Sequence, residues 1–273
     1  WDEGCYVGGG KAVFSTGYMR YMLLLDHPPL SYYLNSIFLL PLKFDRKIWD
    51  YNECWDIGYN VLFNSGYNTN MILFLSRLPF ILLSVILAIY VLNWATELYG
   101  KKSGLLALFL YSFNPSVIAY SGLATADFTA SAMIFIATYH FWKLIKKPSN
   151  KNLILTGIFF SLALLSKTTT ILLGPLFIII GSIAVYKKEY NLKLKTLIKN
   201  LIIIFLISFV LILTFYKFQF GTLKNSLPPG HYSDKARLEL SKSPLFSDIF
   251  LFIYDEVPLP MPNFIAGIGH ILY

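Results

Sequence analysis

Long apolar runs separated by short polar segments dominate residues 77–216, whereas the first 76 residues mix shorter apolar stretches with acids, aromatics and glycines. A membrane-spanning helix needs about 20 predominantly apolar residues. The first run opens at Arg77-Leu78-Pro79, where proline suits a first helical turn. The pattern therefore predicts about six spans, over residues 77–99, 103–121, from beyond Asp127 to near Lys143, 153–165, 171–186 and 201–216.

The remaining segments are too short or too polar to span a bilayer. Leu30–Leu42 holds about 13 apolar residues, so we expect a helix that lies at the interface or packs against the bundle. Residues 45–70 read as a polar loop whose Trp49, Trp55 and tyrosines are typical of the headgroup level. Gly8-Gly9-Gly10 has no strand or helix frame around it, and we expect a flexible loop. Residues 218–273 read as a Pro-rich polar loop with a closing apolar segment.

Composition agrees with a membrane protein. Of 273 residues, 56% are hydrophobic and 14% are charged, whereas soluble domains carry about 25% charged residues. The net charge of +8 does not indicate nucleic-acid binding, because the basic residues cluster between apolar runs. We predict an all-α polytopic membrane protein in three parts: an extracytoplasmic first loop with juxtamembrane helices (1–76), a transmembrane bundle (77–216), and an extracytoplasmic loop with the start of a further apolar segment (217–273).

The charge distribution predicts the orientation of the bundle. Lysines gather around Lys101, around Lys146 and over 187–199, where Glu97 and Glu189 are the accompanying acids. By the positive-inside rule these segments face the cytoplasm. A single crossing between 153 and 186 would put 187–199 outside, so we expect two short helices with Lys167 at their outer turn.

Two further features concern the ends and the cysteines. Cys5 and Cys54 both fall on the predicted outer side, where they could form a disulfide or stay as two unrelated thiols. The chain opens on Trp1, directly beside an acidic pair, and we interpret it as a fragment that lacks its first transmembrane helix.

Ionisable side chains gather on the predicted outer side. Carboxylates beside cations at one membrane face suit transfer from a charged lipid, because a carboxylate can deprotonate an acceptor hydroxyl while a cation neutralises a leaving phosphate. Individual alternatives stay open: a helix cap for Asp127, interfacial anchors for Arg77 and Lys167, and a turn residue for His27. The ionisable residues on this predicted outer side are Asp2, Glu3, Asp26, His27, Arg77, Asp127 and Lys167.

These residues lie in a pattern that resembles the GT-C membrane glycosyltransferases, on the branch of protein O-mannosyltransferases and lipid A aminoarabinose transferases. An Asp-Glu pair is followed by Asp26-His27-Pro28-Pro29-Leu30 and by Arg77-Leu78-Pro79. Further matches are Leu98-Tyr99-Gly100, the turn at Asp127, and the run from Gly157 to Ser166-Lys167. The likeness covers most of residues 1–186.

The resemblance implies a GT-C-type helix bundle that transfers a sugar, with inversion, from a polyprenyl-phosphate or dolichyl-phosphate carrier on the outer face of the plasma membrane. It places the catalytic base on Asp2, with Glu3 in support and Asp127 as a further candidate. Asp26, His27, Arg77 and Lys167 are the expected substrate-binding residues. The acceptor is a hydroxyl on a protein, glycan or lipid. No cofactor is clearly implied, and a divalent metal ion stays open.

Two other functions compete with the transferase. A transporter or flippase of lipid-linked sugars would also need a basic outer vestibule, but it should show internal repeats and mid-membrane charges, and neither is evident. A noncatalytic membrane subunit is the third interpretation, and substitution of Asp2 distinguishes it from an enzyme.

Overall fold

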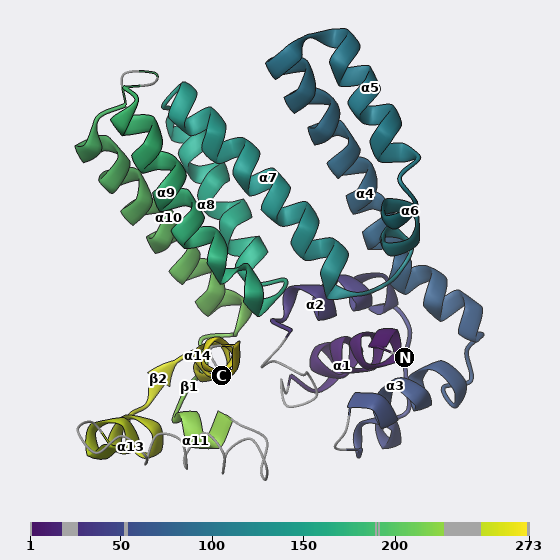
Figure 1. Cartoon of the computed structure of the whole chain (residues 1–273). Helices are drawn as coiled ribbons and strands as arrows, with labels where there is room; N and C mark the ends of the chain where they lie inside the picture. Colours follow the sequence, from purple (N-terminus) through teal and green to yellow (C-terminus); the bar gives the residue numbers. More distant parts are fainter. Residues whose placement is uncertain are drawn as a thin grey trace.

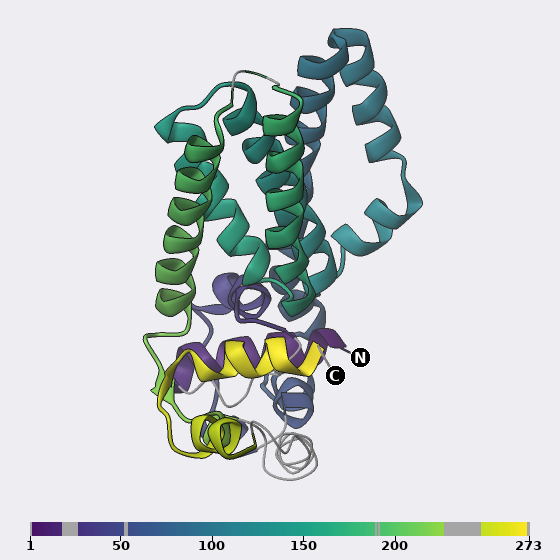
Figure 2. The same ribbon diagram turned by 60° about the vertical axis from the view of Figure 1, so that its left-hand side comes forward.

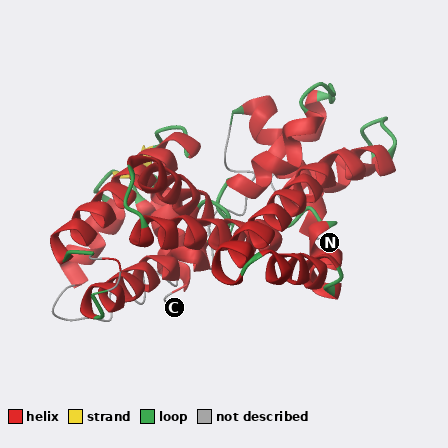
Figure 3. Ribbon diagram, turned by 90° about the horizontal axis from the view of Figure 1, so that it is seen from above, coloured by secondary structure: helices red, strands yellow, loops and turns green. Residues whose placement is uncertain are grey.

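The computed structural model describes residues 2–17, 27–51, 54–188, 190, 192–226 and 247–271, and its described part is almost entirely helical (Figures 1 and 3). This confirms the predicted all-α polytopic membrane fold. A group of long helices forms a bundle, and shorter helices lie across one end of it (Figure 2). Two short strands, β1 (Phe220–Gly221) and β2 (Leu259–Pro260), pair antiparallel beside that end.

Every apolar segment predicted between residues 77 and 216 contains helix, and the one over 103–121 is interrupted at residues 113–114. In the described part of the chain, three helical stretches are long and apolar enough to cross a membrane, and one bent pair would make a fourth. Helix α8 is apolar but shorter. The number of crossings and their orientation therefore stay predictions. The bundle helices are α4 (Thr69–Tyr99), α5 (Lys101–Ser112), α6 (Pro115–Ser121), α7 (Ala126–Lys146), α8 (Asn150–Leu164), α9 (Leu173–Tyr186) and α10 (Leu194–Phe215).

Two boundaries in the bundle differ from the prediction. Helix α4 begins at Thr69, eight residues before Arg77, because the Asn68 side chain caps it by accepting from the Met71 N–H. The span predicted over 103–121 is broken, with α5 and α6 at 60° to each other. Pro115 cannot continue α5 but suits the first turn of α6, and Asn114 caps that new helix.

The turn that carries Lys167 is as predicted. Helix α8 ends at Leu164, and a 3-10 helix, η4 (Thr168–Leu172), leads into α9. Lys167 is the N-cap residue of η4, with extended backbone angles. Two shorter helical stretches with Lys167 between them therefore replace one continuous rod.

The glycine-rich start of the chain is a buried helix, α1 (Asp2–Thr16), so the expected flexible loop is wrong. A Cβ built on Gly8 would lie 2.5 Å from the Gly58 backbone nitrogen, and one on Gly10 would meet the Tyr32 carbonyl oxygen. The glycines let α1 approach α3 (Cys54–Phe63) on one side and α2 (Leu30–Ser36) on the other. Close packing therefore offsets the low helix propensity of glycine.

Residues 45–70 likewise contain helix α3 and a 3-10 helix, η3 (Arg46–Trp49), where a polar loop was expected. A disulfide joins Cys5 of α1 to Cys54 at the start of α3, with an S–S distance of 2.02 Å. Of the two alternatives left open for the cysteines, the structure has the cross-link. Helices α1 and α3 therefore form one covalently closed unit.

Helix α2 connects this unit to the bundle. The helical part of the segment predicted over 30–42 is α2 plus the 3-10 helix η2 (Ile37–Leu39). The Leu30 N–H donates to the Leu165 carbonyl at 3.0 Å, and the Tyr33 hydroxyl donates to the Phe215 carbonyl at 2.9 Å. In Figure 1, α2, α1 and α3 follow one another as layers below the bundle.

The C-terminal part contains helices where a polar loop was expected: α11 (Leu223–Ser226), α13 (Ser247–Asp255) and α14 (Pro262–Ile271). Helix α14 lies across the lower end of the bundle (Figure 2). An apolar groove of about 590 Å³ runs between α8, α9, α10 and the start of α14. Its lining side chains are apolar apart from Ser208.

Candidate functional site

The site begins with Glu3, in the first turn of α1, where its carboxylate holds three chain segments together. Arg77 of α4 donates to it twice, from Nε to Oε1 at 2.9 Å and from Nη2 to Oε2 at 2.6 Å. The backbone N–H of Ala124, in the turn before α7, also donates to Oε1 at 2.8 Å. Burial raises the pKa of Glu3, but the bonds from Arg77 and Ala124 outweigh it, so this pKa lies below its usual value.

A second ion pair lies on the same turn. The Lys167 ammonium is 2.6 Å from the Asp127 carboxylate, and 57% of the Asp127 side chain is exposed. Asp127 is not the helix cap, because Thr125 holds the N-cap position of α7 and makes no side-chain cap bond. The exposed carboxylate is therefore accessible to a ligand, and so is the lysine, which is 32% exposed.

Tyr6 of α1 interacts with two of the acidic groups and with the start of α7. Burial raises the pKa of its hydroxyl, and the negative charges of Asp127 and Asp2 raise it further, while a hydrogen bond with the backbone N–H of Ala126 opposes this rise. The Tyr6 ring centroid is 5.4 Å from that of His27. Sequence reasoning missed Tyr6, although its place one helical turn after the acidic pair was a usable signal.

Asp2 differs from the other two acids. It is exposed in the first turn of α1, and within the described residues no cation pairs with it. Glu3 and Asp127 each have a cationic partner. Asp2 is therefore the one carboxylate of the predicted set, among those the structure describes, that is available to take a proton from an incoming group.

The structure brings together six of the seven predicted site residues at one end of the bundle. Glu3 meets Arg77, Asp127 meets Lys167, and the charge of Asp2 and the ring of His27 both act on Tyr6. Asp26 lies outside the described residues. Among those residues no group of three or more His, Cys, Asp or Glu side chains gathers closely enough to hold a metal ion.

The apolar groove reaches the chain segment that carries Lys167. Leu164 and Ile171 both line the groove, and Lys167 lies between them in the chain. Met261 and Phe264 line it from the side of α14. An extended apolar chain in the groove could therefore carry a charged end to the level of Lys167.

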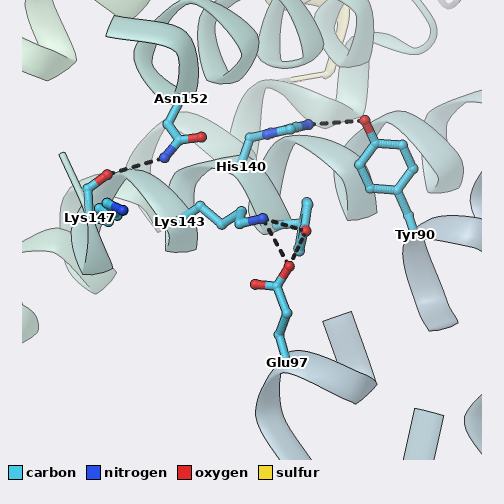
Figure 4. A network of polar contacts seen from close by, with 7 residues as sticks. Tyr90, Glu97, His140, Lys143, Lys147 and Asn152 are labelled. Carbon is cyan, nitrogen blue, oxygen red and sulfur yellow. Dashed lines mark hydrogen bonds and ion pairs between the residues drawn. The ribbon is translucent and has the colours of Figure 1, made fainter. Parts of the chain in front are cut away.

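A second polar network lies at the other end of α4 and was not predicted (Figure 4). The Tyr90 hydroxyl is 3.0 Å from His140 Nε2. Lys143 donates to Glu97 at 2.9 Å and to the Tyr139 hydroxyl at 2.8 Å. Glu97 follows Arg77 by 20 residues, about 30 Å along one helix. This network therefore joins α4 to α7 far from the candidate site.

Comparison with known proteins adds one match. The family described as dolichyl-phosphate-mannose-protein mannosyltransferase matches residues 71–216, which include Arg77, Asp127 and Lys167. No curated protein and no solved structure matches the chain.

Proposed function

The chain belongs to the dolichyl-phosphate-mannose-protein mannosyltransferase family, and we propose that it transfers a hexose from a polyprenyl-phosphate donor to a hydroxyl acceptor. The hexose is mannose or a close relative of it. The acceptor hydroxyl belongs to a protein, glycan or lipid. The observation that carries this proposal is the carboxylate of Asp2, which pairs with no cation among the described residues, beside two carboxylates that already have cationic partners.

In the proposed reaction Asp2 is the general base. The acceptor oxygen forms a bond to the anomeric carbon as its proton passes to the Asp2 carboxylate. The bond from that carbon to the phosphate oxygen breaks, and its electron pair leaves with the polyprenyl phosphate. Attack from the face opposite the leaving group inverts the anomeric configuration. General base catalysis of this kind contributes about 10²–10⁴-fold to rate.

Lys167 is the proposed phosphate contact. Its partner Asp127 is more than half exposed, so the singly charged phosphodiester of an incoming donor competes for the ammonium at modest cost. The apolar groove beside it suits the isoprenoid chain of the donor, because its walls present almost no hydrogen-bonding groups. His27, beside Tyr6, is a second candidate for the phosphate.

Arg77 has a different proposed role from the phosphate contact expected of it. Both of its bonded nitrogens are directed to Glu3. We assign Glu3 and Arg77 to holding α1 against α4 and the Ala124 turn, which keeps Asp2 in place.

The proposed location is the extracytoplasmic side of the plasma membrane. The positive-inside pattern supports it, and so does the Cys5–Cys54 disulfide, because such bonds persist in oxidising compartments. The cross-link lies two residues from Glu3, so the site and the disulfide share one side of the membrane.

The test is transfer itself. Membranes that contain the protein are incubated with polyprenyl-phosphate mannose labelled in the sugar, and protein, glycan and lipid fractions are then counted. We expect label in one fraction, and its loss in Asp2→Asn. Label that crosses the membrane on intact donor, with none in any product, would indicate a transporter instead.

A further inference from the structure

The outward face of α3 carries two parallel rows of side chains that the transfer chemistry does not use. One row is aromatic, with Trp55, Tyr59 and Phe63 exposed by 42%, 59% and 60%. Its members are four residues apart, and the Tyr59 and Phe63 ring centroids are 5.1 Å from each other. Exposed aromatic side chains that recur along one helix face offer an interaction surface.

The second row is polar and lies one residue further along the helix. It consists of Asp56 and Asn60 of α3 and Asn64 just beyond its end. Asn60 Nδ2 donates to the backbone carbonyl of Asp56 at 2.9 Å, and Asn64 Nδ2 donates to the side-chain oxygen Oδ1 of Asn60 at 2.8 Å. Both bonds are exposed, so carboxylate and amide groups remain within reach of a ligand on this face.

We propose that this face of α3 binds a carbohydrate chain. Pyranose rings present apolar C–H faces that stack on aromatic rings, and their hydroxyls bond to planar carboxylate and amide groups at the ring edges. The two rows offer both kinds of contact side by side. Their repeat of four residues is about 6 Å along the helix, which is comparable with the length of one sugar unit in a chain.

The position of α3 favours a ligand from the aqueous side over the bilayer. Helix α1 lies between α3 and α2, with Gly8 against Gly58 and Gly10 against Tyr32, and α2 in turn meets the bundle. Figure 1 shows these helices as successive layers leading away from the bundle. The aromatic row is on the face opposite the buried side chains Cys54, Ile57 and Val61, which face the α1 side.

The face is also close to the candidate site. A Cβ on Gly58 would lie within contact of the Gly4 backbone, two residues from Asp2, and Tyr59 is the next residue of α3. The start of α1 therefore packs against α3, the helix that carries the aromatic row. The role of this surface as an acceptor site rests on the proposed function, and the acceptor in that role is a glycan. Its binding chemistry does not depend on transfer.

The experiment measures binding directly, with the protein in lipid nanodiscs and no donor present. Linear chains of six mannose, glucose or N-acetylglucosamine units are titrated by calorimetry, with each monosaccharide as a length control. We expect at least one chain to bind at least tenfold tighter than its monosaccharide. Trp55→Ala and Tyr59→Ala should each weaken that binding about tenfold or more, as loss of a central aromatic contact does. Trp55→Phe should restore most of it.

Two controls make the outcome decisive. Tyr186→Ala removes a still more exposed tyrosine, 88% accessible, at the end of α9, and should leave binding unchanged. Nanodiscs made with brominated lipids test the bilayer alternative by quenching tryptophan fluorescence. The proposal is overturned if none of the three sugar chains binds. It is also overturned if the brominated lipids quench tryptophan fluorescence in the wild type but not in Trp55→Phe, because Trp55 would then lie in the bilayer. Sugar-chain binding without any transfer from labelled donor would overturn the proposed function alone.

Discussion

Glu3 and Arg77 form a two-point ion pair across 74 residues of sequence, with Oε2 and Nη2 2.6 Å apart. The same carboxylate accepts the Ala124 N–H. One side chain therefore ties α1 to α4 and to the turn before α7. Asp2 precedes Glu3 directly, so this pair sets where the proposed base lies.

Glu3→Gln should loosen that arrangement. The amide keeps the size of the side chain but loses the charge-assisted bonds to Arg77, which is about one-third exposed. We expect a loss of about 1–2 kcal/mol in unfolding free energy, discounted for that exposure. Thermal unfolding of the purified protein in detergent measures it. In a double-mutant cycle with Arg77→Gln, a coupling energy near zero would show that the pair contributes nothing.

The same pair predicts a dependence of stability on pH. Arg77 and Ala124 hold the pKa of Glu3 below its usual value of 4.5. A carboxyl with a lowered folded-state pKa contributes its full stability above the unfolded value, and that contribution is lost as the pH falls through the folded pKa. The difference in melting temperature between wild type and Glu3→Gln should therefore be constant above pH 4.5 and shrink below it. A difference that grows on acidification contradicts the assignment.

The sequence correctly predicted the helices that follow from amino-acid composition alone. Helices α4, α9 and α10 come from long apolar runs, which have few alternatives to a membrane helix. The turn at Lys167 followed from the charge distribution on its two sides. The break at Pro115 was missed, although a proline after Asn114 was a visible signal for a new helix start.

The start of the chain could not be predicted, because its structure depends on distant partners. Gly8 reads locally as a loop residue, and only the backbone of Gly58, fifty residues on, explains a buried glycine helix. The sequence predicted that Arg77 lies on the outer side, but it did not predict the partner of this side chain. An outer-face cation suits a phosphate and a carboxylate equally well, and the structure has it bonded to Glu3.

Gly58→Ala tests the contact between α1 and α3. Its Cβ would lie within contact of the Gly4 carbonyl oxygen, which is backbone and cannot rotate away. We expect destabilisation of about 1–3 kcal/mol and lower activity, because α1 must shift. Gly122→Ala is the matched control, since its nearest neighbour atom would be 3.8 Å away. Equal melting temperatures for the two variants would argue against close packing of α1.

Lys167→Ala tests the proposed phosphate contact. A charge-assisted bond to phosphate is worth about 1.5–3 kcal/mol. The variant should therefore need about tenfold to a hundredfold more donor for half-maximal binding. Lys102→Ala removes the same charge at an exposed position in the first turn of α5 and should bind normally. Wild-type donor affinity in a folded Lys167→Ala protein would assign the lysine to anchoring alone.

Asp2→Asn tests the central claim most directly. The substitution keeps the size of the side chain and removes the base, so turnover of labelled polyprenyl-phosphate mannose should fall at least about a hundredfold while donor affinity stays near wild type. Asp248→Asn, in the first turn of α13 and outside the candidate site, should turn over normally. The decisive measurement is single-turnover transfer by Asp2→Asn at saturating donor. A rate reduced a hundredfold or more supports Asp2 as the base, and a wild-type rate contradicts it.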